Sequence, residues 1–317
     1  MSFQSTRALL LVSLMGAVSA VLGGCATQKT HVVPPAQLRK AQDATKAQLL
    51  DAYNAQARAI QSVNATIELQ LTAGSAYSGV IQDYHDAHGF ILAMRPTSIR
   101  VIGQAPVIGK NVFDMVSDGQ TFRIFIPSKN KFLVGSATLS RPSSKPIENL
   151  RPQHILDVFF WPEIPPDVPM LIEQFDAAPN RYYILTELRQ AEEGGGPGGE
   201  LEIARKVWFD REDLSIARVQ IYGSAGRLDS DIAYSEWAGP SASPGSPSAQ
   251  PQPLGASAGV TFARDIRITR PQDDYQLEIR ITKLALNQPI PADRFDLEQP
   301  PGSELVRVGD ENGGAQP

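Results

Sequence analysis

The sequence predicts a mainly β protein of the α+β class, built on one large, curved antiparallel sheet. Residues 63–72 (VNATIELQLT) are apolar at every second position, which is the period of a strand with one buried and one solvated face. Similar segments follow at short intervals. Short connections favour antiparallel pairing, because a parallel return needs a crossover of about a dozen residues. Only two segments, 36–60 and 151–161, have the character of helices.

The first of these helices is expected to pack one apolar face against the sheet. Residues 36–60 are rich in helix formers and contain neither glycine nor proline. Their apolar residues recur at helical spacing and form one stripe, which is made of Leu38, Ala41, Leu49, Tyr53, Ala57 and Ile60.

The strands are expected in two series on either side of residues 136–180. The first series covers residues 63–72, 77–85, 89–95, 97–103, 112–118, 120–127 and 131–135. The second covers residues 181–190, 200–209, 215–223, 227–237, 259–270 and 274–286. Three segments have compositions typical of flexible chain, namely a hairpin tip at 192–199, an insertion at 239–259 and a tail at 309–317.

The second helix is expected to be short and very apolar. In residues 151–161 (RPQHILDVFFW), Pro152 occupies a first-turn position and Pro162 follows the end. Residues 162–169 contain four prolines and are not expected to form regular structure. Two roles remain open for this helix: a cap over an apolar space, or an ordinary core helix.

The N-terminus predicts export and lipid attachment. Arg7 supplies a positive charge, and residues 8–22 form an apolar run that is short for a membrane span. The run ends in Leu-Gly-Gly-Cys, which resembles the lipobox of bacterial lipoproteins. Cleavage is expected between Gly24 and Cys25, so that residues 1–24 are the signal peptide and the Cys25 thiol carries the lipid. The alternative is an ordinary secretory signal followed by a chance cysteine.

The expected anchor also predicts a location. Residues 25–35 form a tether, and residues 36–308 form one domain. The residue after Cys25 is Ala26 rather than aspartate. By resemblance to proteobacterial sorting, this favours the outer membrane, with the lipid-anchored protein facing the periplasm.

The composition excludes several kinds of chemistry. A net charge of −5 argues against nucleic-acid binding, and one cysteine excludes a disulfide framework, a zinc knuckle and a cysteine redox pair. His85 and His88 lie in the run 83–88 (DYHDAH), where a polar hairpin turn explains them. No metalloprotease, nucleophile-elbow, P-loop or dinucleotide motif occurs. We therefore expect a protein that is not an enzyme, with no catalytic residue, metal ion or cofactor.

Some strands are apolar on both faces, which predicts a partly open cavity between the sheet and its few helices. In residues 89–94, for example, Phe90 and Leu92 point one way and Ile91 the other. A sheet fully covered by its own helices is the alternative. The candidates for lining a cavity are Ile67, Leu69, Leu71, Phe90, Leu92, Met94, Phe159 and Trp161.

The loop at residues 104–110 (QAPVIGK) is a second candidate site. Its proline and glycine indicate a turn, which places the apolar Val107 and Ile108 at the tip. An exposed apolar tip predicts contact with a membrane or a partner. The alternative is that both residues fold back on the core.

Three stretches together resemble the LolA/LolB superfamily of bacterial lipoprotein carriers and receptors. They are the N-terminal helix followed by the strand at 63–72, the run from 94–101 (MRPTSIRV) to 113–120 (FDMVSDGQ), and the ending at 291–302 (PADRFDLEQPPG). The resemblance covers about residues 36–308. The chain departs from LolB in its greater length, its insertion at 239–259 and its expanded middle.

The resemblance implies an unclosed antiparallel β-barrel with helices plugging the concave side. It also implies a cavity for acyl chains such as palmitate, and a role in lipoprotein or lipid transport. Val107 and Ile108 would correspond to the membrane-insertion loop of LolB, and Arg95 and Arg100 are the candidates for the arginine of the LolA cavity. A monomer is expected. The alternative is an RseB-like envelope sensor or protein-interaction module without lipid transfer.

Overall fold

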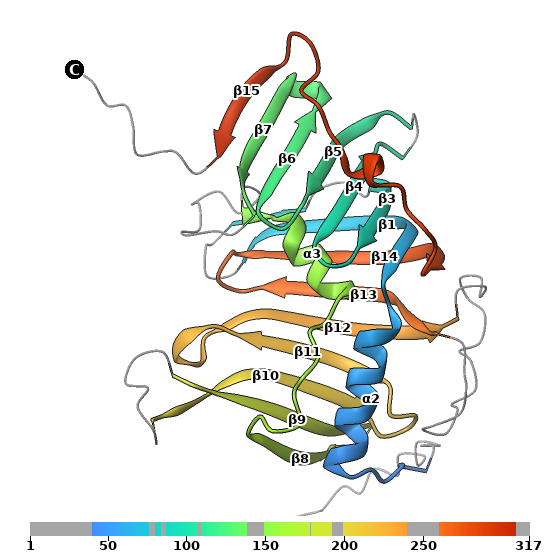
Figure 1. The fold of residues 1–317 in the computed structure, drawn as a ribbon, viewed down its shortest axis with the longest axis vertical. Helices are drawn as coiled ribbons and strands as arrows, with labels where there is room; N and C mark the ends of the chain where they lie inside the picture. Colours follow the sequence, from blue (N-terminus) through green and yellow to red (C-terminus); the bar gives the residue numbers. More distant parts are fainter. Residues whose placement is uncertain are drawn as a thin grey trace, which may run out of the picture. The chain divides into compact units, whose positions relative to one another are not determined.

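One continuous sheet forms most of the protein (Figure 1). The structure, a computed structural model, describes residues 40–75, 80–83, 87–106, 109–137, 149–177, 179–191, 199–239 and 260–308. Within these ranges the sheet has 15 strands, and two α-helices accompany it. The sheet is unclosed, and its neighbouring strands are antiparallel apart from the parallel pair β15–β7. The predicted fold class is therefore confirmed.

The helices are α2 (Lys46–Ala59) and α3 (Pro152–Phe159). The strands are β1 (Ser62–Ser75), β2 (Val80–Asp83), β3 (Ala87–Met94), β4 (Ser98–Gln104), β5 (Asn111–Ser117), β6 (Thr121–Ile126), β7 (Lys131–Ser136), β8 (Met170–Ala177), β9 (Asn180–Gln190), β10 (Leu201–Asp210), β11 (Ile216–Tyr222), β12 (Leu228–Ala238), β13 (Phe262–Arg270), β14 (Tyr275–Leu286) and β15 (Glu304–Val308). Short 3-10 turns lie at η1 (Pro127–Lys129), η3 (Ser224–Gly226) and η4 (Ala292–Phe295).

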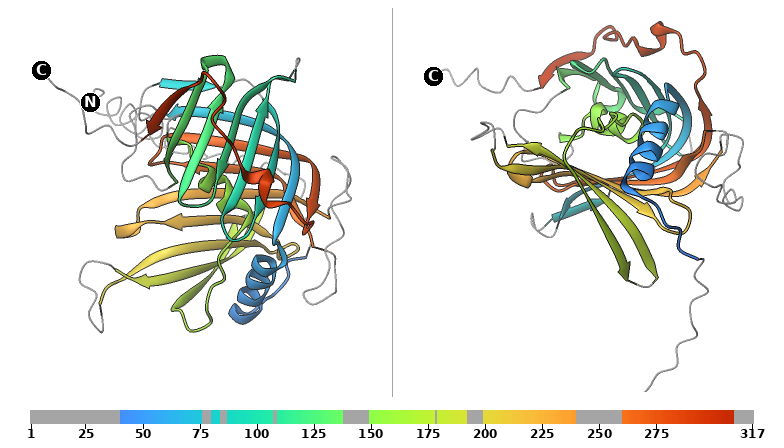
Figure 2. Two further views of the ribbon diagram at one scale, coloured as in Figure 1. Left: turned by 45° about the horizontal axis from the view of Figure 1, so that its top comes forward. Right: turned by 60° about the horizontal axis from the view of Figure 1, so that its bottom comes forward.

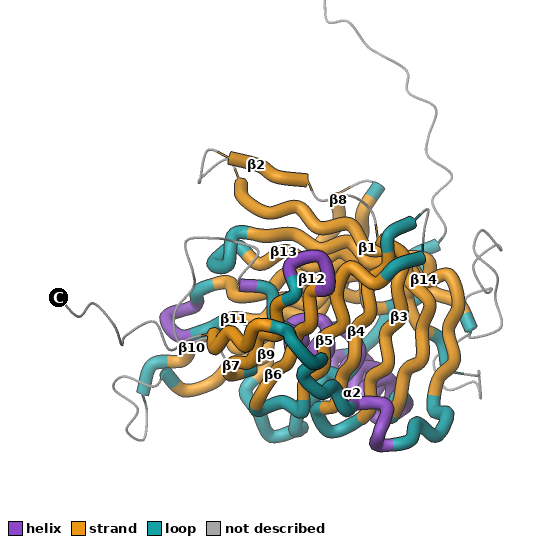
Figure 3. Tube along the Cα trace, turned by 90° about the horizontal axis from the view of Figure 1, so that it is seen from above, coloured by secondary structure: helices purple, strands orange, loops and turns teal. Residues whose placement is uncertain are grey.

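β1 joins the two series of strands into one sheet. The spatial order is β15-β7-β6-β5-β4-β3-β1-β14-β13-β12-β11-β10-β9-β8, and β2 lies alongside the far end of β1 (Figure 3). β1 pairs with β3 on one side and with β14 on the other. The alternation seen in the sequence is the alternation of faces, because Val63, Ala65 and Ile67 are all buried in the core.

Both helices lie against the concave face of the sheet (Figure 2). α2 precedes β1, whereas α3 belongs to the connection between β7 and β8. Those two strands lie near opposite ends of the sheet. The connection must therefore cross a whole face, and its apolar residues cross on the concave side, where they fill the core.

Some elements differ from the sequence prediction. Within the described residues the first helix begins at Lys46 rather than at the predicted residue 36, because Thr45 caps it. The preceding Gln42 donates its backbone N–H to Arg211 O at 2.7 Å and its side-chain amide to Glu212 O at 2.9 Å, which holds that segment outside the helix. β8 and β15 were not predicted. Residues 162–169 contain no helix or strand, as predicted.

The predicted signal peptide (1–24) and tether (25–35) lie outside the described residues, as do the tail (309–317) and most of the two inner flexible segments. The domain boundaries therefore remain predictions. In the described ranges, the helices are too short or too polar to cross a bilayer.

Candidate functional site

Both helices present their apolar faces to the same interior. α2 buries Leu49, Leu50 and Tyr53 because apolar residues recur along it at helical spacing. α3 is apolar on most of its surface and buries Ile155, Leu156, Val158 and Phe159. One hydrophobic cluster contains these side chains together with the inward residues of the sheet.

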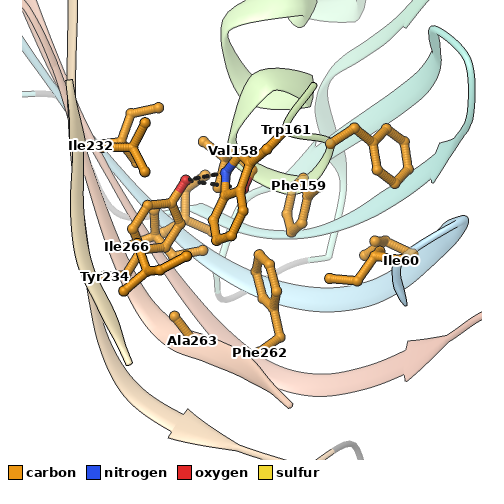
Figure 4. Packing of buried hydrophobic residues seen from close by; sticks show 14 of the residues in the cluster. Ile60, Val158, Phe159, Trp161, Ile232, Tyr234, Phe262, Ala263 and Ile266 are labelled. Atoms are coloured by element: carbon orange, nitrogen blue, oxygen red, sulfur yellow. Dashed lines mark hydrogen bonds between the residues drawn. The ribbon is translucent and has the colours of Figure 1, made fainter. Parts of the chain in front are cut away.

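Aromatic rings join the end of α3 to the sheet (Figure 4). Tyr53 joins the same end to α2. Trp161, 4% exposed, stacks on Tyr53 with the ring centroids 5.6 Å apart and meets Tyr234 edge to face at 5.4 Å. The Trp161 Nε1–H donates to Tyr234 Oη at 2.9 Å, and Tyr234 Oη donates to Val158 O at 3.1 Å. Burial raises the pKa of Tyr234 well above its usual value, so the hydroxyl stays a donor. Phe159 stacks on Phe262 at 5.3 Å.

Residues 160–164, which we call the strap, follow α3 and run beside α2. Tyr53 Oη donates to Pro162 O at 3.0 Å. Asn54 binds both backbone groups of Ile164, donating to its O at 2.8 Å and accepting from its N–H at 2.9 Å. Side chains of α2 therefore replace the backbone pairing that an irregular segment lacks, so that its buried polar groups are satisfied.

Arg95, directly after β3, binds the strap and α2 together. Its Nε donates to Ile60 O at 2.9 Å, and its Nη2 donates to Ala57 O at 2.7 Å and to Trp161 O at 3.1 Å. Its guanidinium also lies 5.0 Å from the centre of the Phe160 ring. Burial lowers the pKa of Arg95. The C-terminal carbonyls of a helix carry partial negative charge, so this position suits a cation.

Arg205, on the inward face of β10, completes these contacts. Its Nη1 donates to Pro162 O at 3.1 Å and to Tyr53 Oη, and its Nε lies 3.5 Å from Glu187 Oε2. Burial, the largest influence, raises the pKa of Tyr53 to about 12 despite the nearby Arg205. The hydroxyl of Tyr53 is thus protonated at neutral pH and available to hold Pro162.

The structure separates the predicted cavity residues into two groups. Ile67, Leu69, Phe159 and Trp161 are buried in the interior, and Leu71 packs against its margin. That these residues line an open cavity remains a prediction.

The other group lies on the convex face of the sheet. Phe90 is 40% exposed, and it lines a pocket of about 330 Å³ together with Leu92 and Ile102. Met94 belongs to the same face by strand alternation and is half-buried. Arg100 also borders this pocket, where Asp114 pairs with it at 2.7 Å. Of the two arginine candidates, only Arg95 binds α2 and the strap, and its side chain is half-buried there.

The remaining predicted site residues lie outside the described residues. They are the cleavage and lipidation site at Gly24 and Cys25 and the loop tip at Val107 and Ile108. The structure does describe the arms of that hairpin. Gln104 and Asn111 pair at its base and line the convex pocket, so the pocket lies at the foot of the predicted insertion loop. The described ranges contain no group of three metal-ligating side chains.

Sequence reasoning missed Asn54, Tyr234 and Arg205. Asn54 reads as an ordinary polar residue of a helix, and its partner lies 110 positions away in the chain. Tyr234 and Arg205 follow the strand alternation without any motif. The only available signal was an inward-facing arginine or tyrosine hydroxyl on an otherwise apolar strand face, which requires a partner.

No protein-family model matches the sequence, and no curated protein matches it. Several solved structures are similar to it. A DUF1329 family protein from Desulfovibrio piger has a TM-score of 0.47 and 13% identity, covering 80% of this chain and 98% of that one. A LolA superfamily protein from Nitrosomonas europaea has a TM-score of 0.45 and 10% identity, and the match covers 80% of this chain and 99% of that one. A domain from Vibrio parahaemolyticus, described as a putative outer membrane lipoprotein-sorting protein domain, has a TM-score of 0.43 and 11% identity. The match covers 78% of this chain and 95% of that one. The superfamily that the sequence resembles is thus represented among these similar structures.

Proposed function

We propose that the protein is an outer-membrane lipoprotein that binds acyl chains in the interior closed by α3 and the strap. Lipidated Cys25 would hold it on the membrane, facing the periplasm, where it would act as a monomer in lipoprotein or lipid transport. The observation that carries the proposal is the way the interior is closed. The segment that closes it, α3 and the strap, is strongly apolar. Hydrogen bonds from side chains to backbone atoms hold the strap in place.

An acyl chain could take the place of the apolar side chains of this segment. A hydrocarbon tail can make the same apolar contacts with the interior as the side chains of Phe160 and Trp161. It cannot replace the hydrogen bonds to the strap. Entry would therefore require Arg95, Tyr53 and Asn54 to release the strap, and departure would allow them to bind it again. Such a balance gives reversible binding, which a transport protein needs.

The convex face supports the membrane part of the proposal. Its apolar pocket lies at the foot of the hairpin that carries Val107 and Ile108. We propose that this tip inserts into the membrane beside the anchor. The proposed activity is binding and transfer, without catalysis.

The packing of the interior favours a second candidate, an RseB-like sensor or interaction module. Trp161 packs against both Tyr53 and Tyr234, and the polar group of each of the three side chains makes a hydrogen bond. A module that never opens would have this filled interior. Uptake of an acyl chain separates the two candidates.

A fluorescence titration tests the proposal. In a full-length Cys25→Ser protein that also carries Trp208→Phe and Trp237→Phe, Trp161 is the remaining tryptophan. A dansyl-labelled fatty acid bound in the interior should quench Trp161 by energy transfer, and unlabelled palmitate should reverse the effect. If a saturating concentration of the probe does not quench Trp161 fluorescence, acyl-chain binding is rejected. The sensor or interaction module is then the remaining candidate.

A further inference from the structure

A second hollow lies on the convex face, on the half of the sheet formed by the second strand series. Val207, Val219 and Ile232 point into the core, so their neighbours Trp208, Arg218 and Ala233 point away from it. These outward side chains line a pocket of about 430 Å³. We call this pocket the trough.

The strand register gives the trough its form. Trp208 pairs with Arg218, Arg218 with Ala233, and Ala233 with Arg267, so four residues form one row across β10 to β13. The small Ala233 lies between long side chains and leaves the hollow. Three interstrand spacings amount to roughly 14 Å, which is longer than one pyranose ring.

One end of the trough is aromatic. Trp208 and Tyr182 lie edge to face with the ring centroids 5.6 Å apart, and Phe175 lies 6.1 Å from Trp208. Phe175 is 42% exposed, and Tyr182 and Trp208 are half-buried. Exposed aromatic rings offer apolar surface of fixed orientation, to which the C–H face of a sugar ring is complementary.

The middle of the trough is polar and held rigidly. Arg218 Nε donates to Asp231 Oδ1 at 2.5 Å, and the guanidinium lies 5.5 Å from the Trp208 ring centre. The buried Gln220 accepts from Trp208 Nε1 at 3.2 Å and donates to Asp231 Oδ2 at 3.3 Å. These contacts fix a guanidinium and a carboxylate in place before any ligand arrives.

The charges in the trough cancel. Both arginines that line it are paired, Arg218 with Asp231 and Arg267 with Glu278 at 2.8 Å. A phosphate or carboxylate ligand would have to compete with these carboxylates for the guanidinium groups. A neutral ligand with adjacent hydroxyls can donate to the carboxylates and accept from the guanidinium groups without breaking either pair.

We propose that the trough binds an uncharged oligosaccharide, with a sugar ring against Trp208 and its hydroxyls on Arg218 and Asp231. The site is independent of the proposed acyl-chain site, because the two lie on opposite faces of the sheet.

Calorimetric titration of the full-length Cys25→Ser protein with chitotetraose, cellotetraose and maltotetraose tests this proposal. At least one of the three should bind, and Trp208→Ala should weaken that binding about tenfold or more. Ala233→Trp fills the trough without removing a contact and should abolish binding. Leu305→Ala removes an exposed apolar side chain from β15, at the other edge of the sheet, and should leave the affinity unchanged.

Two results would overturn the proposal. The first is that none of the three sugars binds. If the parent then binds phosphatidylethanolamine vesicles through Trp208, the trough is a membrane contact. The second is that Ala233→Trp, in a variant whose circular dichroism is unchanged, binds as well as the parent.

Discussion

Arg95 is a cation held by backbone carbonyls. It makes no ion pair in the part of the chain that the structure describes, and its three acceptors come from α2, the residue after α2 and the strap. A planar guanidinium presents several N–H groups in fixed directions, so it can bind three carbonyls at once. Lysine, with one ammonium group, could not bind all three in the same geometry.

We expect Arg95→Met to loosen the strap. It removes three charge-assisted hydrogen bonds and leaves buried carbonyls without a donor, so the free energy of unfolding in urea should fall by about 2–3 kcal/mol. Uptake of the dansyl-labelled fatty acid should become faster. Arg100→Met is the matched control, because it makes the same change on the convex face and breaks the pair with Asp114. Equal uptake rates in the two variants would contradict a role for Arg95 in closure.

The buried His154 of α3 predicts a pH dependence. Its Nδ1 lies 2.6 Å from Tyr275 Oη, and burial, followed by Arg270 and Arg151, lowers its pKa well below 6.5. As the pH falls below about 6.5, the unfolded chain takes up a proton that the folded protein does not. The folded protein should therefore lose stability, with a slope approaching about 1.4 kcal/mol per pH unit.

Comparison with His154→Gln isolates this effect. Asp157 contributes in the opposite direction, because burial raises its pKa, but its contribution is common to both proteins and cancels. From pH 7 to pH 5, urea unfolding should show the parent losing stability relative to the variant. Parallel curves across that range would show that His154 takes up its proton equally in both states.

Only those site residues that belong to the hydrophobic core could be predicted from the sequence. Burial of Phe159, Trp161, Ile67 and Leu69 follows from periodicity alone. Strand alternation also explains why the predicted cavity-lining residues divide between the two faces of the sheet. Ile91 points into the core, so its neighbours Phe90 and Leu92 lie on the opposite face. The polar contacts to the strap were not predictable, because they join side chains to backbone atoms of an irregular segment far along the chain.

The start of α2 is fixed by a capping box. Gln48 N–H donates to Thr45 Oγ1 at 3.3 Å, and Thr45 N–H donates back to Gln48 Oε1 at 2.8 Å. Thr45→Ala should lower the free energy of unfolding by about 1 kcal/mol, because it leaves orphan N–H groups at the helix start. Thr45→Ser keeps the acceptor oxygen and should retain most of that stability in urea unfolding. If serine lost as much as alanine, the hydroxyl would not be the cap.

The two strands that sequence reasoning missed lie at the edges of the sheet. β8 is exposed along nearly its whole length, so it has no buried face to impose alternation, and Leu171 and Ile172 are consecutive apolar residues. β15 has five residues and pairs in parallel with β7, from which it is far separated in sequence. β8 pairs with β9 from Ala177 and Asn180 onward, as in a hairpin, but it lacks the alternation that identified the inner strands. β15 has no hairpin connection to β7.

The order of the strands along the chain explains why the strap exists. The first strand series ends near one edge of the sheet and the second begins at the other, so the connection between β7 and β8 must cross the concave face. The sequence shows that this connection is apolar and rich in proline. It does not show that β1 pairs with β14, the contact that makes one sheet of the two series. That pairing joins segments more than 200 residues apart.

The proposed anchor gives the last prediction. Each buried methylene of an acyl chain contributes about 0.8 kcal/mol to membrane binding, and two or more chains hold a protein far more firmly than one. All of them would depend on the Cys25 thiol, since it is the only cysteine in the chain. Cys25→Ser should therefore move the protein from the membrane fraction to the soluble fraction of the cell envelope. Thr27→Ala, two residues away, keeps the thiol and should stay with the membrane. If Cys25→Ser fractionates with the membrane as Thr27→Ala does, contacts of the folded domain hold the protein there, and the acyl anchor is not needed.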